Sequence, residues 1–231
     1  MDVIILAGGL GTRLRPVLPD IPKVLAPIGE RSFLEFLLER LQRQGIGRFV
    51  LSVGFRHALI EEAVGTAYKG VPIQYAIEAE PLGTGGAIRF AATYCNGDDV
   101  VVLNGDSYVD VDLRRFVNMH RRNHAGLSVC AVEVENAERY GRIRVDGSRI
   151  VGFSKKGIVG PGLINAGVYV MRRNLLDSLA LPTVFSFEEE ILAGRLAEIG
   201  PRVFRVTGTF IDIGIPEDYA RAQIELAEIA L

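Results

Sequence analysis

Cysteine is scarce in this sequence, which has only Cys95 and Cys130 among its 231 residues. Neither has a partner at a CxxC spacing, and each lies in an apolar or helical segment. This pattern supports neither a disulfide framework nor a paired-cysteine metal motif. We therefore expect two reduced thiols, which fits a cytoplasmic protein.

Long apolar runs are also missing. No stretch approaches the roughly 18 consecutive apolar residues of a membrane span. The first nine residues have no basic region, and their apolar run is too short for a signal peptide. We expect a soluble, cytoplasmic protein without a membrane partner.

The chain has almost no net charge. Lys and Arg number 26 and Asp and Glu 28, so the formal charge is −2, and nothing draws the chain to nucleic acid. Hydrophobic residues at 48% and charged residues at 23% exclude a disordered chain. With no linker or repeat, we expect one domain over residues 1–231.

Apolar strands alternate with amphipathic helices in the first half. Fully apolar strands separated by helices are typical of a parallel sheet that is covered on both faces. The predicted strands are Val3–Leu6, Arg48–Val53, Ile73–Ala76 and Val100–Leu103, and the predicted helices are Ser32–Gln44, His57–Val64, Gly85–Tyr94 and Leu113–Arg122.

The second half has a mixed pattern. Asp146-Gly147 between two short strands is a hairpin signal, and Ser186 with Glu189 forms a capping box like that of Ser32 with Glu35. The predicted strands are Leu127–Val134, Arg142–Val145, Ile150–Phe153 and Leu163–Met171, and the predicted helices are Ser186–Leu196 and Pro216–Ile229.

Glycine is in excess, with 26 residues or about 11% against a usual ~7%. Several glycines lie in the string LAGGLGTRLRP, which begins at Leu6 directly after the first strand. Such a loop aims backbone N–H groups at one point and binds phosphate oxygens. It is neither a GxGxxG nor a P-loop motif, and it adds the cations Arg13 and, ten residues later, Lys23.

Two further motifs follow later strands. The string EAEPLGTGGA begins at Glu78, and its glycines allow a flat ligand to pass close to the backbone, although a plain turn into a helix explains it nearly as well. The string VVVLNGD ends at Asp106 and places a carboxylate at the carboxyl end of a buried strand. Ligand sites of open α/β sheets lie at that edge, but helix capping explains such an aspartate equally well.

Together these motifs resemble the nucleotidylyltransferases that act on sugar 1-phosphates, in the same order from residue 3 to about residue 220. Further strings are most similar to the guanylyltransferases for D-glycero-α-D-manno-heptose 1-phosphate, with the mannose 1-phosphate enzymes close behind. These strings are PLGTGGAI from Pro81, LINAG from Leu163, FSFEE from Phe185 and FIDIGIPEDY from Phe210.

The resemblance implies a Rossmann-like α/β nucleotidyltransferase fold, with a mixed, mostly parallel sheet flanked by helices and no C-terminal β-helix. It also implies a Mg²⁺-dependent transfer of a nucleotidyl group from a nucleoside triphosphate to a sugar 1-phosphate, which releases pyrophosphate. The product would be a nucleotide sugar for surface polysaccharides such as lipopolysaccharide or capsule. A homodimer is the default expectation from general frequencies.

The same resemblance implies a nucleotide-binding half (1–125) and a sugar-phosphate-binding half (126–231), and it assigns roles to single residues. Arg13, Lys23 and Asp106 would be catalytic, and Asp106 and Asp212 would hold the metal ion. Gly141, Lys156 and Asn165 would bind the sugar phosphate. The nucleotide would be bound by Leu6, Ala7, Gly8, Gly9, Gly11, Thr12, Arg13, Glu78, Pro81, Gly83 and Thr84.

Glu78 carries the prediction for the base. The resemblance places it at the Watson–Crick edge, where guanine presents two adjacent donors and adenine presents an acceptor. An ionised carboxylate only accepts hydrogen bonds, so it favours GTP. The alternative interpretation is an exposed glutamate at the end of a strand.

One string departs from the family. Where the family has Phe-x-Glu-Lys, this chain has Phe153-Ser154-Lys155-Lys156, and a lysine cannot accept hydrogen bonds from sugar hydroxyls. Either the sugar is held differently, or Lys155 points to solvent, or activity is compromised. The alternative functions are therefore a mannose 1-phosphate guanylyltransferase, a UTP- or dTTP-dependent hexose 1-phosphate enzyme, and a regulatory homologue that binds a nucleotide sugar without turnover.

Overall fold

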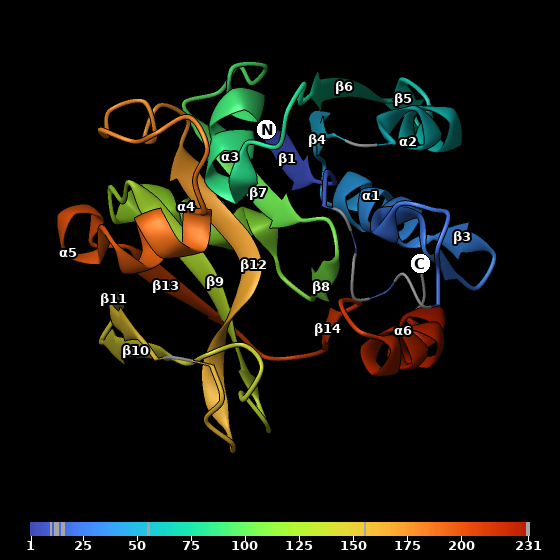
Figure 1. Cartoon of the computed structure of the whole chain (residues 1–231). Coiled ribbons are helices and arrows are strands. Elements are labelled where there is room, and N and C mark those ends of the chain that lie inside the picture. The colour runs from blue at the N-terminus through green and yellow to red at the C-terminus, as the bar shows by residue number, and fades with distance from the viewer. Residues whose placement is uncertain (10, 12–13, 15–16, 55, 155, 230–231) are drawn as a thin grey trace.

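The computed structural model describes residues 1–9, 11, 14, 17–54, 56–154 and 156–229. In these ranges a single ten-stranded sheet crosses the molecule (Figure 1). Its strands, in spatial order, are β10 (Ile143–Asp146), β11 (Arg149–Phe153), β13 (Arg202–Val206), β9 (Leu127–Val134), β12 (Gly162–Arg172), β7 (Asp99–Asn104), β1 (Asp2–Leu6), β4 (Arg48–Val53), β6 (Val71–Ile77) and β5 (Ala67–Tyr68).

The strand directions confirm a mixed sheet. β6, β4, β1 and β7 are parallel, as the apolar strands of the first half predict. β12 is antiparallel to both β7 and β9, and it joins the two halves of the chain in one sheet. The strands β10 and β11 form the hairpin predicted at Asp146-Gly147. The expected Rossmann-like mixed α/β fold is therefore present, and the division at residue 125 stays a prediction.

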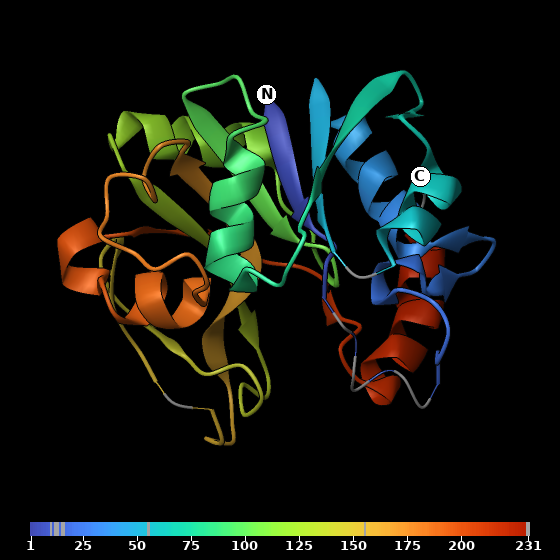
Figure 2. The ribbon, with the colours of Figure 1, turned by 45° about the horizontal axis from the view of Figure 1, so that its top comes forward.

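Helices cover both faces of this sheet (Figures 1 and 2). They are η1 (Lys23–Leu25, 3₁₀), α1 (Phe33–Arg43), α2 (His57–Val64), α3 (Gly83–Ala92), α4 (Leu113–Arg122), η2 (Phe187–Ala193, a π-helix), α5 (Leu196–Ile199) and α6 (Pro216–Glu228). Two small antiparallel sheets of two strands each complete the fold. They pair β2 (Pro27–Ile28) with β3 (Arg31–Ser32), and β8 (Ser107–Val109) with β14 (Phe210–Asp212).

The alternation of side chains along each strand supplies a core to each face. In β1, Val3 and Ile5 pack with α1, α2 and α4, whereas Ile4 packs with α3 and η2. All three side chains are fully buried. An apolar strand with helices on both faces needs no polar side, which is why its sequence is a continuous hydrophobic run.

Both cysteines lie inside these cores. Cys95 and Cys130 are free and buried, as expected from their isolation in the sequence. Burial raises the pKa of each thiol to about 12, because a thiolate loses its hydration in the protein interior. Both thiols are therefore uncharged at neutral pH.

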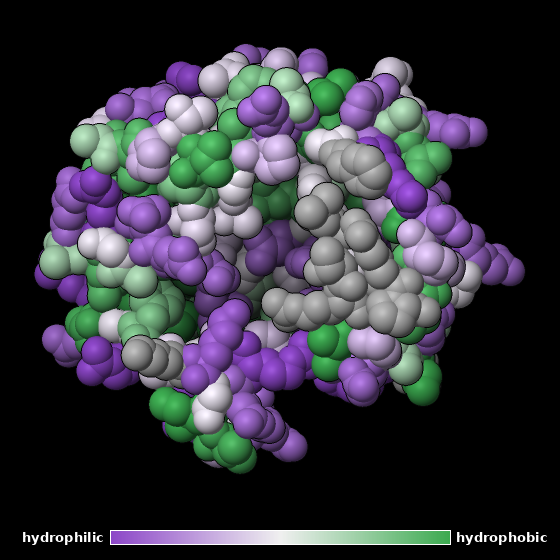
Figure 3. All heavy atoms as spheres, in the orientation of Figure 1, coloured by the Kyte–Doolittle hydropathy of each residue, from purple (hydrophilic) through white to green (hydrophobic). Residues whose placement is uncertain are grey.

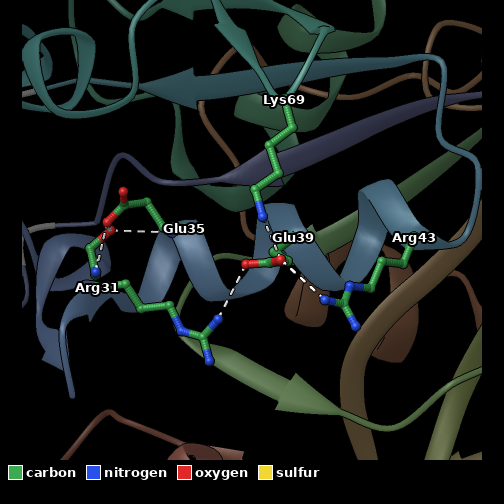
Figure 4. A network of polar contacts seen from close by, with 6 residues as sticks. Arg31, Glu35, Glu39, Arg43 and Lys69 are labelled. Atoms are coloured by element: carbon green, nitrogen blue, oxygen red, sulfur yellow. Dashed lines mark hydrogen bonds and ion pairs between the residues drawn. The ribbon is translucent and has the colours of Figure 1, made fainter. Parts of the chain in front are cut away.

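Helix α1 begins where its capping box predicts. The Glu35 N–H donates to Ser32 Oγ at 3.2 Å, and the Ser32 N–H donates to Glu35 Oε2 at 2.8 Å. One helical turn later, the nearly buried Glu39 accepts hydrogen bonds from Arg31, Arg43 and Lys69 (Figure 4). These cations hold the pKa of Glu39 below its usual value, and the Lys69 hydrogen bond is the largest contribution. This cluster joins α1 to the β5–β6 turn.

The prediction of one helix over Ser186–Leu196 is wrong in detail. Ser186 caps the segment as expected, and its Oγ accepts from the Glu189 N–H at 3.2 Å. The segment is a π-helix, in which the Gly194 N–H donates to Glu189 O at 2.8 Å, five residues back. A Cβ at Gly194 would lie 2.9 Å from Glu190 O, so only glycine fits this wider turn, and α5 starts as a separate helix.

The last quarter of the chain holds elements that the sequence pattern did not indicate. β13 runs parallel to β9, and β14 pairs with β8. Helix α6 then returns to the N-terminal part, where the Tyr219 hydroxyl donates to Pro27 O at 2.8 Å. It shares a buried cluster with α1, and Figures 1 and 2 both draw the two helices on the same side of the molecule.

Candidate active site

The glycine loop and the Asn-Gly-Asp string meet at the carboxyl ends of parallel strands. The Ala7 N–H donates to Ser52 O at 2.8 Å, which extends the β1–β4 pairing beyond Leu6. On the other side, the Gly105 N–H donates to Leu6 O at 2.9 Å. A Cβ at Gly105 would lie 2.5 Å from that oxygen, so glycine is required for this close approach. The first and third motifs are thereby brought side by side.

Three of the predicted residues form a charge cluster. Lys23 Nζ lies 2.7 Å from Asp106 Oδ2 and 3.7 Å from Asp212 Oδ1. The lysine side chain is 13% exposed, whereas those of Asp106 and Asp212 are 41% and 26% exposed. Two carboxylates therefore share one ammonium group at a site that solutes can reach.

The pairing of β8 with β14 brings the two aspartates together. Asp212 stands opposite Ser107 in this antiparallel pair, and the Ile213 N–H donates to Asp106 O at 2.9 Å. The Gly214 N–H donates to Asp212 Oδ1 at 2.8 Å and fixes the direction of its carboxylate. Residues more than 100 positions apart in sequence are thus held by backbone hydrogen bonds.

The surroundings of Asp212 disfavour its negative charge. Burial is the main cause that raises its pKa, and the neighbouring Asp106 raises it further. Lys23, the Gly214 N–H and Arg139 act in the opposite direction but do not reverse the shift. Asp212 is therefore a partly buried carboxylate beside a second carboxylate, an arrangement that a bound cation would stabilise.

Arg139 is a site residue that the sequence analysis missed. Its guanidinium donates to Asp218, whose side chain is buried, and its Nη2 lies 3.9 Å from Asp212 Oδ2. It lies two residues before Gly141, which is predicted to bind the sugar phosphate. Only this adjacency could have indicated it, because an arginine in a polar loop is usually a solvated surface group.

Glu78 is half-buried and fixed by neutral donors. Its Oε1 accepts from Ser52 Oγ at 3.1 Å, and its Oε2 accepts from the Leu82 N–H at 3.0 Å. A Cβ at Gly8 would lie 3.2 Å from Oε1, so the carboxylate directly adjoins the glycine loop. The interpretation as a freely exposed strand-end glutamate does not fit these contacts. Each oxygen keeps a second lone pair for a ligand.

The glycines of the PLGTGG string are explained by packing. Gly83 has φ +69°, and a Cβ there would lie 2.5 Å from Phe185 O. At Gly85 a Cβ would lie 2.1 Å from the Phe185 ring. The Thr84 hydroxyl accepts from the Phe187 N–H at 2.9 Å. This loop therefore packs against the start of η2 and is hydrogen-bonded to it. Pro81, Gly83 and Thr84 are nevertheless exposed to solvent.

The glycine loop is described in part. Leu6 and Gly8 are half-buried, Ala7 is buried and Gly9 is exposed. Gly11 has φ +58°, and a Cβ there would lie 3.2 Å from Lys23 Cβ, so the loop and the lysine are in contact. Thr12 and Arg13, which we predict to bind nucleotide, lie outside the described residues.

The predicted sugar-phosphate residues come from β12 and two loops. The Asn165 amide donates to the Tyr169 hydroxyl at 2.7 Å and accepts from the Gly167 N–H at 3.1 Å. Gly141 is buried with φ +74°, and Lys156 is exposed. Lys155 lies outside the described residues. The roles of Gly141, Lys156 and Asn165 stay predictions.

The face drawn in Figure 3 is hollowed near its centre, and hydrophilic side chains line the hollow. Figure 1, in the same orientation, has β7, β8 and β12 in this region. Among the described residues no group of three or more His, Cys, Asp or Glu side chains could hold a metal ion. The acidic pair is still suited to Mg²⁺, which takes one or two carboxylates and completes its shell with phosphate and water. The ammonium of Lys23 shows that a cation is accommodated there.

Residues 2–228 match the family described as Nucleotidyl transferase. The chain belongs to the nucleotidyl transferase family. It is 41% identical, over 98% of each chain, to the D-glycero-alpha-D-manno-heptose 1-phosphate guanylyltransferase of Aneurinibacillus thermoaerophilus. It is 39% identical to the enzyme of that name from Campylobacter jejuni, over 95% of this chain and 97% of the other.

A solved structure agrees with this nucleotidyl transferase assignment. HddC from Yersinia pseudotuberculosis, in complex with GMP-PN, superposes with a TM-score of 0.84 at 36% identity. The match covers 96% of this chain and 97% of that chain. As a nucleotidyl transferase, the chain is an enzyme that transfers a nucleotidyl group. No helix in its described ranges has both the length and the apolar character needed to cross a lipid bilayer.

Proposed function

We propose that this nucleotidyl transferase moves GMP from GTP to D-glycero-α-D-manno-heptose 1-phosphate, which gives GDP-heptose and pyrophosphate. The observation that carries the proposal is the identity of 41% and 39% to two such guanylyltransferases along almost the whole of each chain. The likeness to HddC, solved with GMP-PN, supports a guanine nucleotide.

The reaction needs positioning more than acid–base chemistry. An oxygen of the sugar phosphate attacks the α-phosphorus in line, and pyrophosphate leaves from the opposite side. Because the attacking phosphate is already ionised, no side chain has to remove a proton. The barrier comes mainly from bringing two anions together, so fixed positive charge is the main requirement.

The acidic pair and Lys23 would meet this requirement. Asp106 and Asp212 would hold Mg²⁺, which when bound neutralises triphosphate oxygens and stabilises the charge that develops on them. Lys23, next to Gly11 of the glycine loop, would neutralise the phosphates from the protein side. Arg13 would add a second cation within that loop.

Glu78 would select the base. Its carboxylate is held by Ser52 and the Leu82 N–H, which leaves one lone pair on each oxygen for guanine N1–H and N2–H₂. ATP presents an acceptor at N1, which would face a carboxylate oxygen. The support for this proposal is the contact of Glu78 with the glycine loop, together with its fixed orientation.

The sugar phosphate would bind on the side of β12. Asn165, Gly141 and Lys156 are the proposed contacts, and Arg139 beside Tyr140 adds positive charge next to Asp212. Heptose, mannose and glucose 1-phosphates share the phosphate group and differ in the rest of the sugar. Contacts to the phosphate therefore do not select among them, and substrate tests decide which sugar is used.

The direct test is pyrophosphate release with Mg²⁺ over a grid of substrates. GTP, ATP, CTP, UTP and dTTP are each combined with heptose, mannose and glucose 1-phosphates. Release confined to GTP with D-glycero-α-D-manno-heptose 1-phosphate supports the proposal. Turnover with mannose 1-phosphate or with another nucleotide overturns the finer assignment, and nucleotide binding without any turnover favours a regulatory homologue.

A further inference from the structure

Lys23 stands where a divalent cation would be expected. Its ammonium lies between Asp106 and Asp212, at 2.7 and 3.7 Å from their oxygens. It is the only lysine or arginine in ion-pair contact with Asp106 among the described residues, whereas Asp212 also has Arg139 at 3.9 Å. An ammonium and a metal ion cannot occupy the same place between two carboxylates.

The lysine also lies against the phosphate-binding loop. At the backbone end of the lysine side chain, a Cβ added at Gly11 would lie 3.2 Å from Lys23 Cβ. At the ammonium end, a Cβ added at Gly214 would lie 3.3 Å from Lys23 Nζ and 2.7 Å from Asp212 Oδ1. A larger residue at either position would therefore crowd the lysine side chain.

These contacts give Lys23 two possible anionic partners. One is the acidic pair, and the other is a triphosphate bound by the loop that contains Gly11. While the ammonium holds the acidic pair, a metal ion has to displace it, which weakens metal binding. A bound triphosphate offers the ammonium another partner and at the same time brings further oxygen ligands for the metal.

We propose that Lys23 is an exchangeable counter-ion, which closes the acidic pair to metal in the free enzyme and moves to the triphosphate when nucleotide binds. The acidic pair then takes up its metal ion together with the nucleotide rather than before it. This inference rests on the proposed function, which supplies the metal ion and the triphosphate.

The test measures binding of Mn²⁺ alone, without nucleotide, by electron paramagnetic resonance at about pH 8, where carboxylates are ionised. The proteins are the wild type, Lys23→Met, Lys23→Gln, Asp106→Asn and the double variant Lys23→Met with Asp106→Asn, and binding is then repeated with GMP-PN present. Lys69→Met is the matched control, because it removes one positive charge from the distant Glu39 cluster. Thermal unfolding of each variant verifies that it is folded.

Loss of the lysine charge is expected to tighten Mn²⁺ binding by about tenfold or more, because the ammonium no longer competes for the carboxylates. The double variant should lose this gain, and Lys69→Met should bind like the wild type. A structural role for Lys23 alone predicts weaker binding of every ligand, and so does not predict this gain.

Two results would overturn the proposal, and only the second of them also contradicts the proposed function. If Mn²⁺ binds with GMP-PN in an Asp106-dependent way, but Lys23→Met and Lys23→Gln bind Mn²⁺ alone no more tightly than the wild type, the exchange is wrong and the proposed function stands. If no Asp106-dependent Mn²⁺ binding occurs even with GMP-PN, the metal assignment of the proposed function also fails.

Discussion

Two clusters of charge in this protein have opposite balances. At Glu39 one carboxylate is surrounded by Arg31, Arg43 and Lys69, and its pKa is lowered (Figure 4). At the active-site cluster two carboxylates, Asp106 and Asp212, share Lys23, and the pKa of Asp212 is raised. The first cluster has three cations around one carboxylate, whereas in the second burial and the neighbouring Asp106 outweigh the effect of Lys23 and Arg139 on Asp212.

We interpret this difference as that between a structural and a functional arrangement. The charge of Glu39 is already stabilised by cations of the chain itself. The charge of Asp212 is disfavoured by burial and by Asp106, so we propose that the pair takes an added cation. A carboxylate with a perturbed pKa beside a second carboxylate is a candidate ligand site.

The largest expected effect tests whether the acidic pair is functional at all. Asp106→Asn should reduce kcat/KM by about 10³-fold, or about 4 kcal/mol, because one of two metal carboxylates is lost. Pyrophosphate release measures the effect. Asp110→Asn is the control, since Asp110 is a largely exposed neighbour paired with Arg40. Wild-type activity in Asp106→Asn would break the comparison.

Glu78 extends the comparison to a third carboxylate, one held by neutral donors. Glu78→Gln should lower kcat/KM for GTP by roughly 10- to 100-fold and leave that for ATP unchanged or higher, because a donor replaces an acceptor at the guanine edge. Steady-state rates with both nucleotides measure this. Glu80→Gln, at an exposed position nearby, should change neither rate. An unaltered preference for GTP in Glu78→Gln would refute the base assignment.

The Glu39 cluster should act on stability and not on catalysis. Glu39→Gln should lower the free energy of unfolding by about 1–3 kcal/mol, since charge-assisted hydrogen bonds to three cations are lost. Urea unfolding measures the loss, with Glu62→Gln as an exposed control on α2. A drop in kcat with unchanged stability would contradict the structural assignment.

The stability that Glu39→Gln loses should depend on pH in a defined direction. The pKa of Glu39 in the folded protein is below the ordinary value of 4.5, so its contribution is complete above that pH. It disappears as the pH falls through the lowered folded value. The difference between wild type and Glu39→Gln should therefore shrink over this acidic range.

The smallest expected effect comes from relief of repulsion in the acidic pair. Asp212→Asn should raise the free energy of unfolding at neutral pH by a few tenths to about 1 kcal/mol, while activity falls, because an unfavourable buried charge beside Asp106 is removed. Thermal unfolding without metal measures the gain. A clear loss of stability would mean that Asp212 serves the fold as much as the site.

Much of the fold could be predicted from local pattern. The four parallel strands, the capping box at Ser32 and the Asp146-Gly147 hairpin all follow from short-range signals. β13 was missed because its sequence, RVFRV, has two arginines and is only partly buried. The π-helix was missed because its sequence, FEEEILA after the Ser186 cap, carries no local signal that distinguishes hydrogen bonds to the fifth residue back from those to the fourth.

The candidate site could be predicted in part. Asp106 follows an apolar strand, so its place at the sheet edge was foreseeable, while Asp212 was indicated only by a family resemblance. Arg139 was missed because its partner Asp218 lies 79 residues away in the chain. The glycines of the PLGTGG string looked suited to a ligand, but a Cβ at Gly83 or Gly85 would collide with Phe185, and one at Gly86 would collide with Thr183 O.

The sequence by itself determined the order of the main strands and helices in the first half, the isolated thiols and the family, because these depend on residues close together in the chain. Only the tertiary structure decided that Lys23, Asp106 and Asp212 meet in surroundings that disfavour the charge of Asp212. That outcome depends on the pairing of β8 with β14 and on burial around Asp212, which no local pattern specifies. A shared cation between distant carboxylates is a property of the folded chain.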